Sequence, residues 1–127
     1  MDTRTKIITA AQARELARGL PNTALATGYF DIVLAAHVGD LERVRESLPE
    51  VVLFVGLGTP RQPLLEAHAR AELVAALAVV DYVVSLEDWE LENLLAAFPE
   101  DRIIRLEVAH EQRMRELIQH VHRRQSQ

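Results

Sequence analysis

The sequence predicts an α/β domain: a small, doubly wound, Rossmann-like parallel sheet of about four strands with helices on both faces. Short runs rich in β-branched residues alternate with longer segments of helical periodicity along the chain. The runs Val51–Val55 and Tyr82–Val84 are apolar on both strand faces, which is typical of strands buried between helices. Repeated strand–helix–strand units need right-handed crossovers, and these wind helices onto both faces of one sheet.

The expected elements follow one another through short connections. Thr9 suits the N-cap of the first helix, and Gly19 with Pro21 ends it. Helices are expected at Ala10–Arg18, His37–Ser47, Leu64–Ala78, Trp89–Phe98 and Glu111–Arg123. Strands are expected at Ala24–Thr27, Val51–Gly56, Tyr82–Ser85 and Arg102–Leu106. In such a sheet a ligand binds at the carboxyl ends of the strands, where the winding reverses.

Composition limits the function classes. The chain has 127 residues, a formal net charge of −5 and no cysteine. A single domain over residues 1–127 is expected, with its N-terminal helix inside 1–20 and a frayed end at 124–127. The acidic balance argues against nucleic acid or a membrane as partner, and the lack of thiols excludes disulfides and thiolate zinc sites. No leader or membrane-length apolar run is visible, which predicts a cytoplasmic protein.

The segment from Thr27 to Val38 is the best candidate for chemistry, because it links the first expected strand to the following helix. Gly28 would let backbone approach a ligand closely. The N-terminus of the next helix offers free N–H groups to an anion, and His37 in its first turn could donate to a phosphate oxygen. A buried turn whose histidine is satisfied by backbone explains the same residues equally well.

The pattern Thr-Gly-Tyr-Phe-Asp-Ile-x-x-x-x-His-Val over 27–38, followed by Leu41, resembles the signature of the cytidylyltransferase-like nucleotidyltransferases. Among them the chain is most similar to heptose-phosphate adenylyltransferases and glycerol-3-phosphate cytidylyltransferases. Further matches are Lys6–Thr9, Val55-Gly56, Arg61, Pro63, Arg70–Glu72, Ala75–Leu77 and Val80–Val84. The likeness extends from Lys6 to Leu86 and is weak beyond that residue.

The resemblance implies a strand order of 3-2-1-4, frequent dimers and a nucleoside triphosphate held over the first strand–helix turn. A substrate phosphate would attack the α-phosphate of ATP or CTP and release pyrophosphate. No tightly bound cofactor is expected, and Mg²⁺ would enter with the nucleotide. The implied nucleotide or phosphate contacts are Thr27, Gly28, Tyr29, Phe30, Asp31, His37, Gly58, Arg61 and Arg70, with His37 the one catalytic candidate. For Asp31 a supporting role in the turn is preferred, and Val80–Tyr82 matches a dimer contact.

The chain departs from the family pattern in its first motif. The family has His-x-Gly-His where this chain has Leu34-Ala35-Ala36-His37. Leu34 cannot donate a hydrogen bond, and Ala36 adds a methyl group where glycine lets backbone and nucleotide approach. The loss of one donor to a transition state typically costs ~10²–10³ in rate. This change predicts weak or absent catalysis.

Two further phosphate-handling segments differ. After the second strand, Gly58 and Pro60 stand where the family carries an Asn-x-Asp turn, and Lys6 is the only lysine of the chain. Arg61 could replace the missing lysine, although the two side chains are not equivalent. The family's Ser/Thr-rich start of the last helix corresponds here to 108–113, which has no hydroxyl.

Three functions remain open. The chain is a degenerate family member that binds a nucleotide, an active enzyme that transfers AMP or CMP to a phosphorylated small molecule, or a scaffold with a closed site. No metal site is predicted, because His110, His120 and His122 lack an acidic partner at ligand spacing. His68 is expected to be partly exposed on a helix. A homodimer is the expected assembly, with Trp89 packed against a neighbouring helix or a second subunit.

Overall fold

The computed structural model describes residues 2–31, 35–60 and 63–125. Its centre is a sheet of five parallel strands in the order β1-β4-β3-β2-β5. The strands are β1 (Ile7–Ile8), β2 (Thr23–Gly28), β3 (Val52–Leu57), β4 (Tyr82–Ser85) and β5 (Ile103–Arg105). The central pair aligns Thr23 with Val52 and continues to Gly28 beside Leu57. The fold class is therefore as predicted.

The four predicted strands lie in the predicted order, since β4-β3-β2-β5 corresponds to 3-2-1-4. The fifth strand was not predicted. It is β1, which pairs Ile7 with Val83 and Ile8 with Val84 at the sheet edge. A strand of two residues is too short to show the alternation by which strands are recognised in a sequence.

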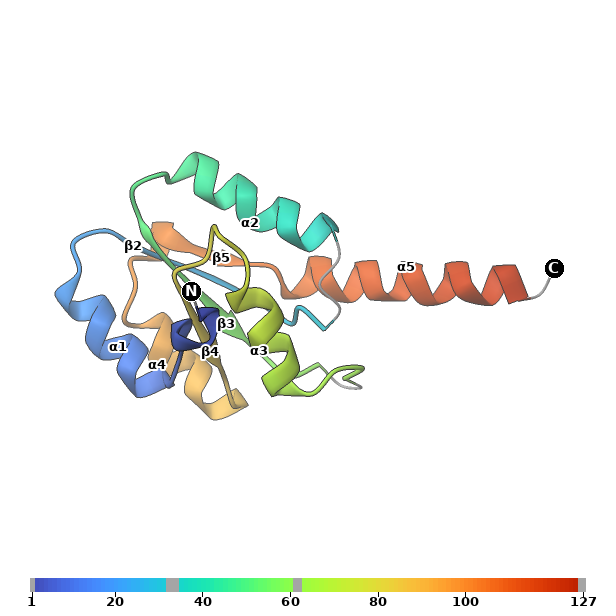
Figure 1. Ribbon diagram of the computed structural model, residues 1–127, viewed down its shortest axis with the longest axis horizontal. Coiled ribbons are helices and arrows are strands. Elements are labelled where there is room, and N and C mark those ends of the chain that lie inside the picture. The colour runs from blue at the N-terminus through green and yellow to red at the C-terminus, as the bar shows by residue number, and fades with distance from the viewer. Residues whose placement is uncertain (1, 32–34, 61–62, 126–127) are drawn as a thin grey trace.

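The helices form two layers (Figure 1). Helices α2 (Ala35–Ser47) and α3 (Ala67–Ala75) cover one face, where Leu41 and Val74 pack with Val55 of β3. Helices α1 (Ala10–Gly19) and α4 (Leu91–Leu95) cover the other, where Ala13 packs with Phe54. Adjacent residues of β3 thus point into opposite cores, because side chains alternate along a strand.

Helix α5 (Glu107–Gln125) differs from the other helices in its position (Figure 1). It begins at the carboxyl end of the sheet, directly after β5, and its second half extends away from the rest of the molecule. Sequence periodicity placed its start at Glu111, four residues too late. Because the helix begins at Glu107, His110 lies within its first turn rather than in the preceding loop. From this position its side chain contacts the loop after β2.

Helices α3 and α4 are shorter than the sequence predicts. Helix α3 begins at Ala67 rather than Leu64, because the amides of Leu64 and Leu65 bind a side chain from another loop. The predicted helix at Trp89 opens as a 3₁₀ turn over Asp88–Glu90, and the α-helical part starts at Leu91. Trp89 is 74% exposed, so it does not pack against a neighbouring helix of its own chain.

Lys6 and Arg45 both bind backbone carbonyls of the connection between α3 and β4. The Nζ of Lys6 donates to the carbonyls of Leu77 and Val80, at 3.1 and 2.8 Å. Arg45 donates to the carbonyl of Val79 and to the carboxylate of Asp81. The only lysine of the chain therefore serves the fold and lies away from the site described next. No helix in the described ranges is long and apolar enough to cross a membrane.

Candidate functional site

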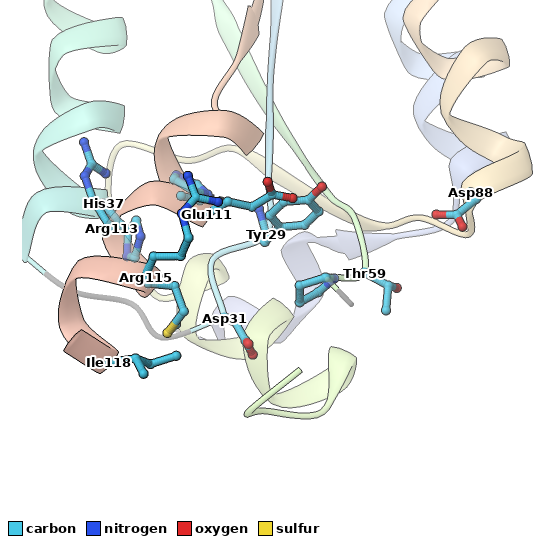
Figure 2. Close-up of a pocket in the computed structure, with 12 residues that line it drawn as sticks. Tyr29, Asp31, His37, Thr59, Asp88, Glu111, Arg113, Arg115 and Ile118 are labelled. Atoms are coloured by element: carbon cyan, nitrogen blue, oxygen red, sulfur yellow. Dashed lines mark hydrogen bonds between the residues drawn. The ribbon is translucent and has the colours of Figure 1, made fainter. Parts of the chain in front are cut away.

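The candidate site is a cleft at the carboxyl ends of the strands, beside β2 (Figure 2). Strand β2 is the point at which the winding reverses, because β3 and β4 follow on one side and β5 on the other. The cleft has a volume of about 830 Å³ and lies between the β2–α2 loop, the β3–α3 loop and α5. It is lined by Tyr29, Asp31, His37, Thr59, Pro60, Asp88, His110, Glu111, Arg113, Met114, Arg115 and Ile118.

The loop after β2 turns its amides toward one acceptor. Phe30 has a φ of 46°, in the left-handed region that residues other than glycine rarely adopt. The backbone N–H groups of Tyr29 and Phe30 both donate to Nδ1 of His110, at 3.0 and 3.4 Å. Successive amides that converge in this way form a concave nest that suits an electron-rich atom. We call these two N–H groups the amide nest.

Gly28 is needed for this contact. A Cβ at position 28 would lie 2.4 Å from Cε1 and 2.6 Å from Nδ1 of His110. Atoms cannot approach that closely, so any other residue would displace the imidazole. The space expected to admit a ligand is filled by the protein's own histidine. From the sequence, a histidine bonded to backbone in this turn was considered only for His37; the histidine that accepts from the backbone of the turn is His110.

His110 belongs to a cluster of three buried rings. Its ring centroid lies 4.4 Å from that of Phe30 and 4.5 Å from that of His37, with edge-to-face geometry in both pairs. His37 lies in the first turn of α2, as predicted, and is buried. Burial, followed by the nearby His37, lowers the pKa of His110 to about 4. His110 is therefore neutral near pH 7, with its proton on Nε2 because Nδ1 accepts.

The Nε2 atom of His110 is buried and has no hydrogen-bond partner among the residues that the structure describes. The nearest carboxylate oxygen is Oδ2 of Asp40, at 3.8 Å, which is too far for a hydrogen bond. Asp40 is itself bound by Arg113, whose Nη2 donates to Oδ1 at 2.9 Å, and by Arg43. Burial acts to raise the pKa of Asp40, but its bonds to Arg113 lower it overall. This ion pair ties α5 to α2.

Asp31 lines the cleft and binds backbone of a neighbouring loop. Its carboxylate accepts from the backbone N–H of Leu64, at 2.8 Å, and of Leu65, at 2.9 Å. The side chain is buried and fixes the loop that leads into α3. These contacts are compatible with the supporting role in the turn that was preferred from the sequence.

Arg70 is also used by the fold. It is buried in α3, and its Nη1 donates to the carbonyls of Tyr29 and Gly58, at 3.0 and 2.8 Å. Burial lowers the pKa of Arg70, and the charge of Asp31 opposes that change. From its position in α3, the Arg70 side chain thus links the loop after β2 to the loop after β3. Gly58 takes part through its backbone alone, since its N–H donates to the carbonyl of Gly28 at 3.0 Å.

Thr27 faces the start of α5. Its Oγ1 donates to Oε1 of Glu107 at 2.9 Å, and Arg105 holds the same carboxylate. Burial acts to raise the pKa of Glu107, but the bonds from Arg105 and Thr27 lower it overall. The Tyr29 ring lies beside Glu111 in the cleft (Figure 2). Burial, and then the negative charge of Glu111, raise the pKa of its hydroxyl.

The structure thus brings together most of the residues predicted for the site. The carboxyl end of β2 is surrounded by Thr27 to Asp31, His37, Gly58 and Arg70. Leu34 and Arg61, the replaced histidine and the candidate phosphate cation, lie outside the described residues. In the described ranges, no group of three or more His, Asp or Glu side chains has the geometry to hold a metal ion.

Sequence reasoning missed His110, Asp40, Arg113 and Arg115 as site residues. A signal for His110 was present, because 108–113 aligns with the family's last phosphate-handling segment. It was considered only as a metal ligand. His68, in contrast, lies on the outside of α3 as predicted, where its Nε2 is 3.0 Å from Glu72.

The comparison with known proteins identifies the family. A family model described as "Cytidylyltransferase-like" matches residues 25–126, which covers the sheet from β2 onward and the cleft. The chain belongs to the cytidylyltransferase-like family. The resemblance inferred from the segment at 27–38 is thereby confirmed at the level of the family.

Relatives of this family member include several bacterial proteins called "Bifunctional protein HldE". That of Citrifermentans bemidjiense is 34% identical over 91 residues, which are 65% of this chain and 18% of the relative. Those of Alcanivorax borkumensis and Pseudomonas fluorescens are 33% and 32% identical over 85 residues, 61% of this chain and 18% of each relative. The chain thus spans less than a fifth of their length.

Proposed function

We propose that this chain binds a nucleoside triphosphate or a related phosphate compound in the cleft beside β2, with little or no turnover. One observation carries the proposal. Groups that the resemblance assigns to phosphate, the loop after β2 and Arg70, are bonded to the protein itself, while the cleft in front of them stays open. A binding site whose phosphate-binding groups are already hydrogen-bonded within the protein fits a family member that binds a nucleotide without converting it to product.

Two walls of the cleft support binding of an anion. Helix α2 begins beside the cleft, where its residue His37 lines the wall, and the positive end of the dipole of its 13 residues lies there. Across the cleft, α5 contributes Arg113 and Arg115 (Figure 2). Arg113 is bound to Asp40, so Arg115 is the cation that we assign to the ligand. Mg²⁺ would enter as part of the nucleotide substrate.

Weak turnover follows from the first motif. Leu34 replaces a donor, and Ala36, which is exposed at the start of α2, replaces the glycine beside the nucleotide. Transition-state stabilisation needs donors aimed at the oxygens on which charge develops. His37 is the remaining candidate of that motif, and its ring contacts Phe30 and His110. One donor alone would leave most of the barrier in place.

Ligand-induced stabilisation tests the proposal. Thermal unfolding would be recorded with ATP, CTP and their diphosphates, each with Mg²⁺. At ~100 times its Kd, a ligand adds about 2.7 kcal/mol to the stability, which moves the midpoint by roughly 5–10 °C. The shift should decrease in Arg115→Ala and persist in Arg18→Ala, an exposed arginine of α1. No shift with any nucleotide would contradict binding and favour the scaffold.

Turnover is tested on the same protein by pyrophosphate release with ATP or CTP and phosphorylated small molecules. The expected result is no release above background in the native chain. Leu34→His with Ala36→Gly restores the family motif and should raise release by at least ~10² if the cleft still places both substrates. Substantial release by the native chain would show an active nucleotidyltransferase instead.

The proposal includes a homodimer. Trp89 is 74% exposed on the 3₁₀ turn Asp88–Glu90, where a second subunit could cover it. Within the matched segment Val80–Tyr82, Val80 is buried, whereas Asp81 and Tyr82 are half-buried and are the residues of that segment that could contribute to the contact. Light scattering after size exclusion should give a dimer mass for the native chain and a monomer mass for Trp89→Ser.

A further inference from the structure

We propose that the amide nest of Tyr29 and Phe30 is an oxyanion site and that His110 is its built-in competitor, which a phosphate oxygen must displace. The inference rests on the proposed function, since it names the groups at which the phosphate of that ligand would bind. It adds the condition that the His110 ring must leave before the ligand binds. The site therefore exists in two states, closed by the imidazole or occupied by ligand.

The geometry of the nest is the first argument. Two consecutive amides donate to one atom, Nδ1 of His110, and the chain turns away directly after them at Phe30, whose φ is left-handed. Such pairs of N–H groups suit anionic oxygens. A neutral imidazole nitrogen fills the same place with a weaker acceptor, because hydrogen bonds to a charged oxygen are about twice as strong as neutral ones. A phosphate oxygen therefore competes well for these donors.

The unpartnered side of the ring is the second argument. Within residues 2–31, 35–60 and 63–125, no group makes a hydrogen bond with the buried Nε2 of His110, and Oδ2 of Asp40 at 3.8 Å is already bound by Arg113. A buried donor without an acceptor is destabilising, and the cost is removed when the ring moves to water. The hydrogen bonds to Nδ1 thus stabilise the closed state, and the unbonded Nε2 destabilises it.

The position of the ring is the third argument. His110 lines the cleft and lies in the first turn of α5, directly after β5. The missing Cβ of Gly28 leaves the volume that the ring occupies, with a closest approach of 2.4 Å. When the ring leaves, that volume opens onto the cleft in front of both amides. A ligand then gains backbone donors that are unavailable in the closed state.

A permanent structural role for His110 makes the opposite prediction. If the ring only fastens α5 to the sheet, its removal lowers stability and leaves anion affinity unchanged. If the ring competes with ligand, its removal also tightens anion binding. When a site is open in one molecule of ten, opening it fully lowers the apparent Kd about tenfold. Affinity, measured apart from stability, separates the two roles.

The test is a titration of the full chain with inorganic pyrophosphate at constant ionic strength, followed by amide NMR. His110→Ala should bind at least about tenfold more tightly than the native chain, with the largest shifts at the amides of Tyr29 and Phe30. His110→Asn, whose amide oxygen can still accept from the nest, should stay near native affinity. His68→Ala removes an exposed histidine and is the matched control. Equal affinity of His110→Ala and the native chain would overturn the proposal.

The native chain supplies a second measurement if His110→Ala does not fold. Ring ¹⁵N shifts of His110 report whether Nδ1 accepts a hydrogen bond. They should change together with the amides of Tyr29 and Phe30 as pyrophosphate or ATP saturates the protein. Ligand binding that leaves the His110 shifts unchanged would overturn the competition and leave the proposed function intact. No binding by the native chain, with tight binding by His110→Ala, would support competition and contradict the proposed function of the native protein.

Discussion

The two sides of the cleft use charged residues differently. On the side between β2 and β3, the hydrogen bonds of Asp31 and Arg70 within the described part of the chain join backbone groups of neighbouring loops. On the side of α5, His110 covers the amide nest and Arg113 binds the side chain of Asp40. The first side is a fixed framework. The second consists of contacts that a ligand could replace. A residue that matches a family motif can therefore be retained because the loops need it, with no contact to substrate.

Replacement of Arg70 should have the largest effect on the framework side. Arg70→Ala would leave the carbonyls of Tyr29 and Gly58 without a donor and open a cavity in α3. We expect a loss of about 3 kcal/mol or more in the free energy of unfolding, a fall of roughly 10–15 °C in Tm. Thermal and urea unfolding measure it. Arg18→Ala should change stability by less than about 0.5 kcal/mol. A loss as small as that for Arg70→Ala would remove the distinction between the two sides.

On the α5 side, burial of His110 should make the free energy of unfolding depend on pH. The pKa of His110 falls to about 4 in the folded chain, so the unfolded chain binds the extra proton between that value and about 6.5. Stability therefore rises with pH across this window, is complete above it and is lost as pH falls. The expected change between pH 7 and pH 5 is about 2 kcal/mol. His37, Asp40, Arg113 and Glu107 are the charged or titratable groups around the ring.

Urea unfolding at a series of pH values between 5 and 7 gives that slope, and His110→Asn should lack most of it. The carboxylates of Asp40 and Glu107 have lowered pKa values and contribute below this window. A slope that persists unchanged in His110→Asn would assign it to another group and would mean that the imidazole is not held neutral by its surroundings.

Asp31→Asn should have the smallest effect and sharpens the comparison. The substitution keeps one oxygen for the amides of Leu64 and Leu65 but replaces the other with a donor that faces them. A loss of about 1–2 kcal/mol is expected from the weakened bonds. Nucleotide affinity, measured by calorimetry, should change less than about twofold. A large drop in affinity without a loss of stability would mean that Asp31 contacts the ligand or its Mg²⁺.

Local sequence patterns predicted the sheet well. Strand β4 lies at Tyr82–Ser85 as expected, because an apolar run between turn residues is a local signal. The order of the strands followed from the family resemblance, since residues 27–38 carry the signature of a known fold. Strand β1 was missed because its two residues gain strand geometry only by pairing with β4.

The site was predicted in place but not in detail. Thr27, Gly28 and His37 lie where the signature implies, yet the partner that fills the amide nest is His110, some 80 residues further along the chain. The alignment of 108–113 with a phosphate-handling segment indicates that His110 lies near the site, but it does not indicate which atoms His110 binds. Only the crossover that brings α5 beside β2 creates that pairing. The same holds for Asp40 and Arg113, whose contact spans α2 and α5.

Lys6 has a practical consequence for experiments on this chain. Its amine is the only lysine amine and is bonded to the carbonyls of Leu77 and Val80. A reagent that acylates amines needs an unprotonated nitrogen that is free of such bonds, so the side chain must first leave both carbonyls. The rate of labelling at Lys6 therefore reports how often these two bonds open, and a cross-linker specific for lysine has this single half-buried side chain to react with.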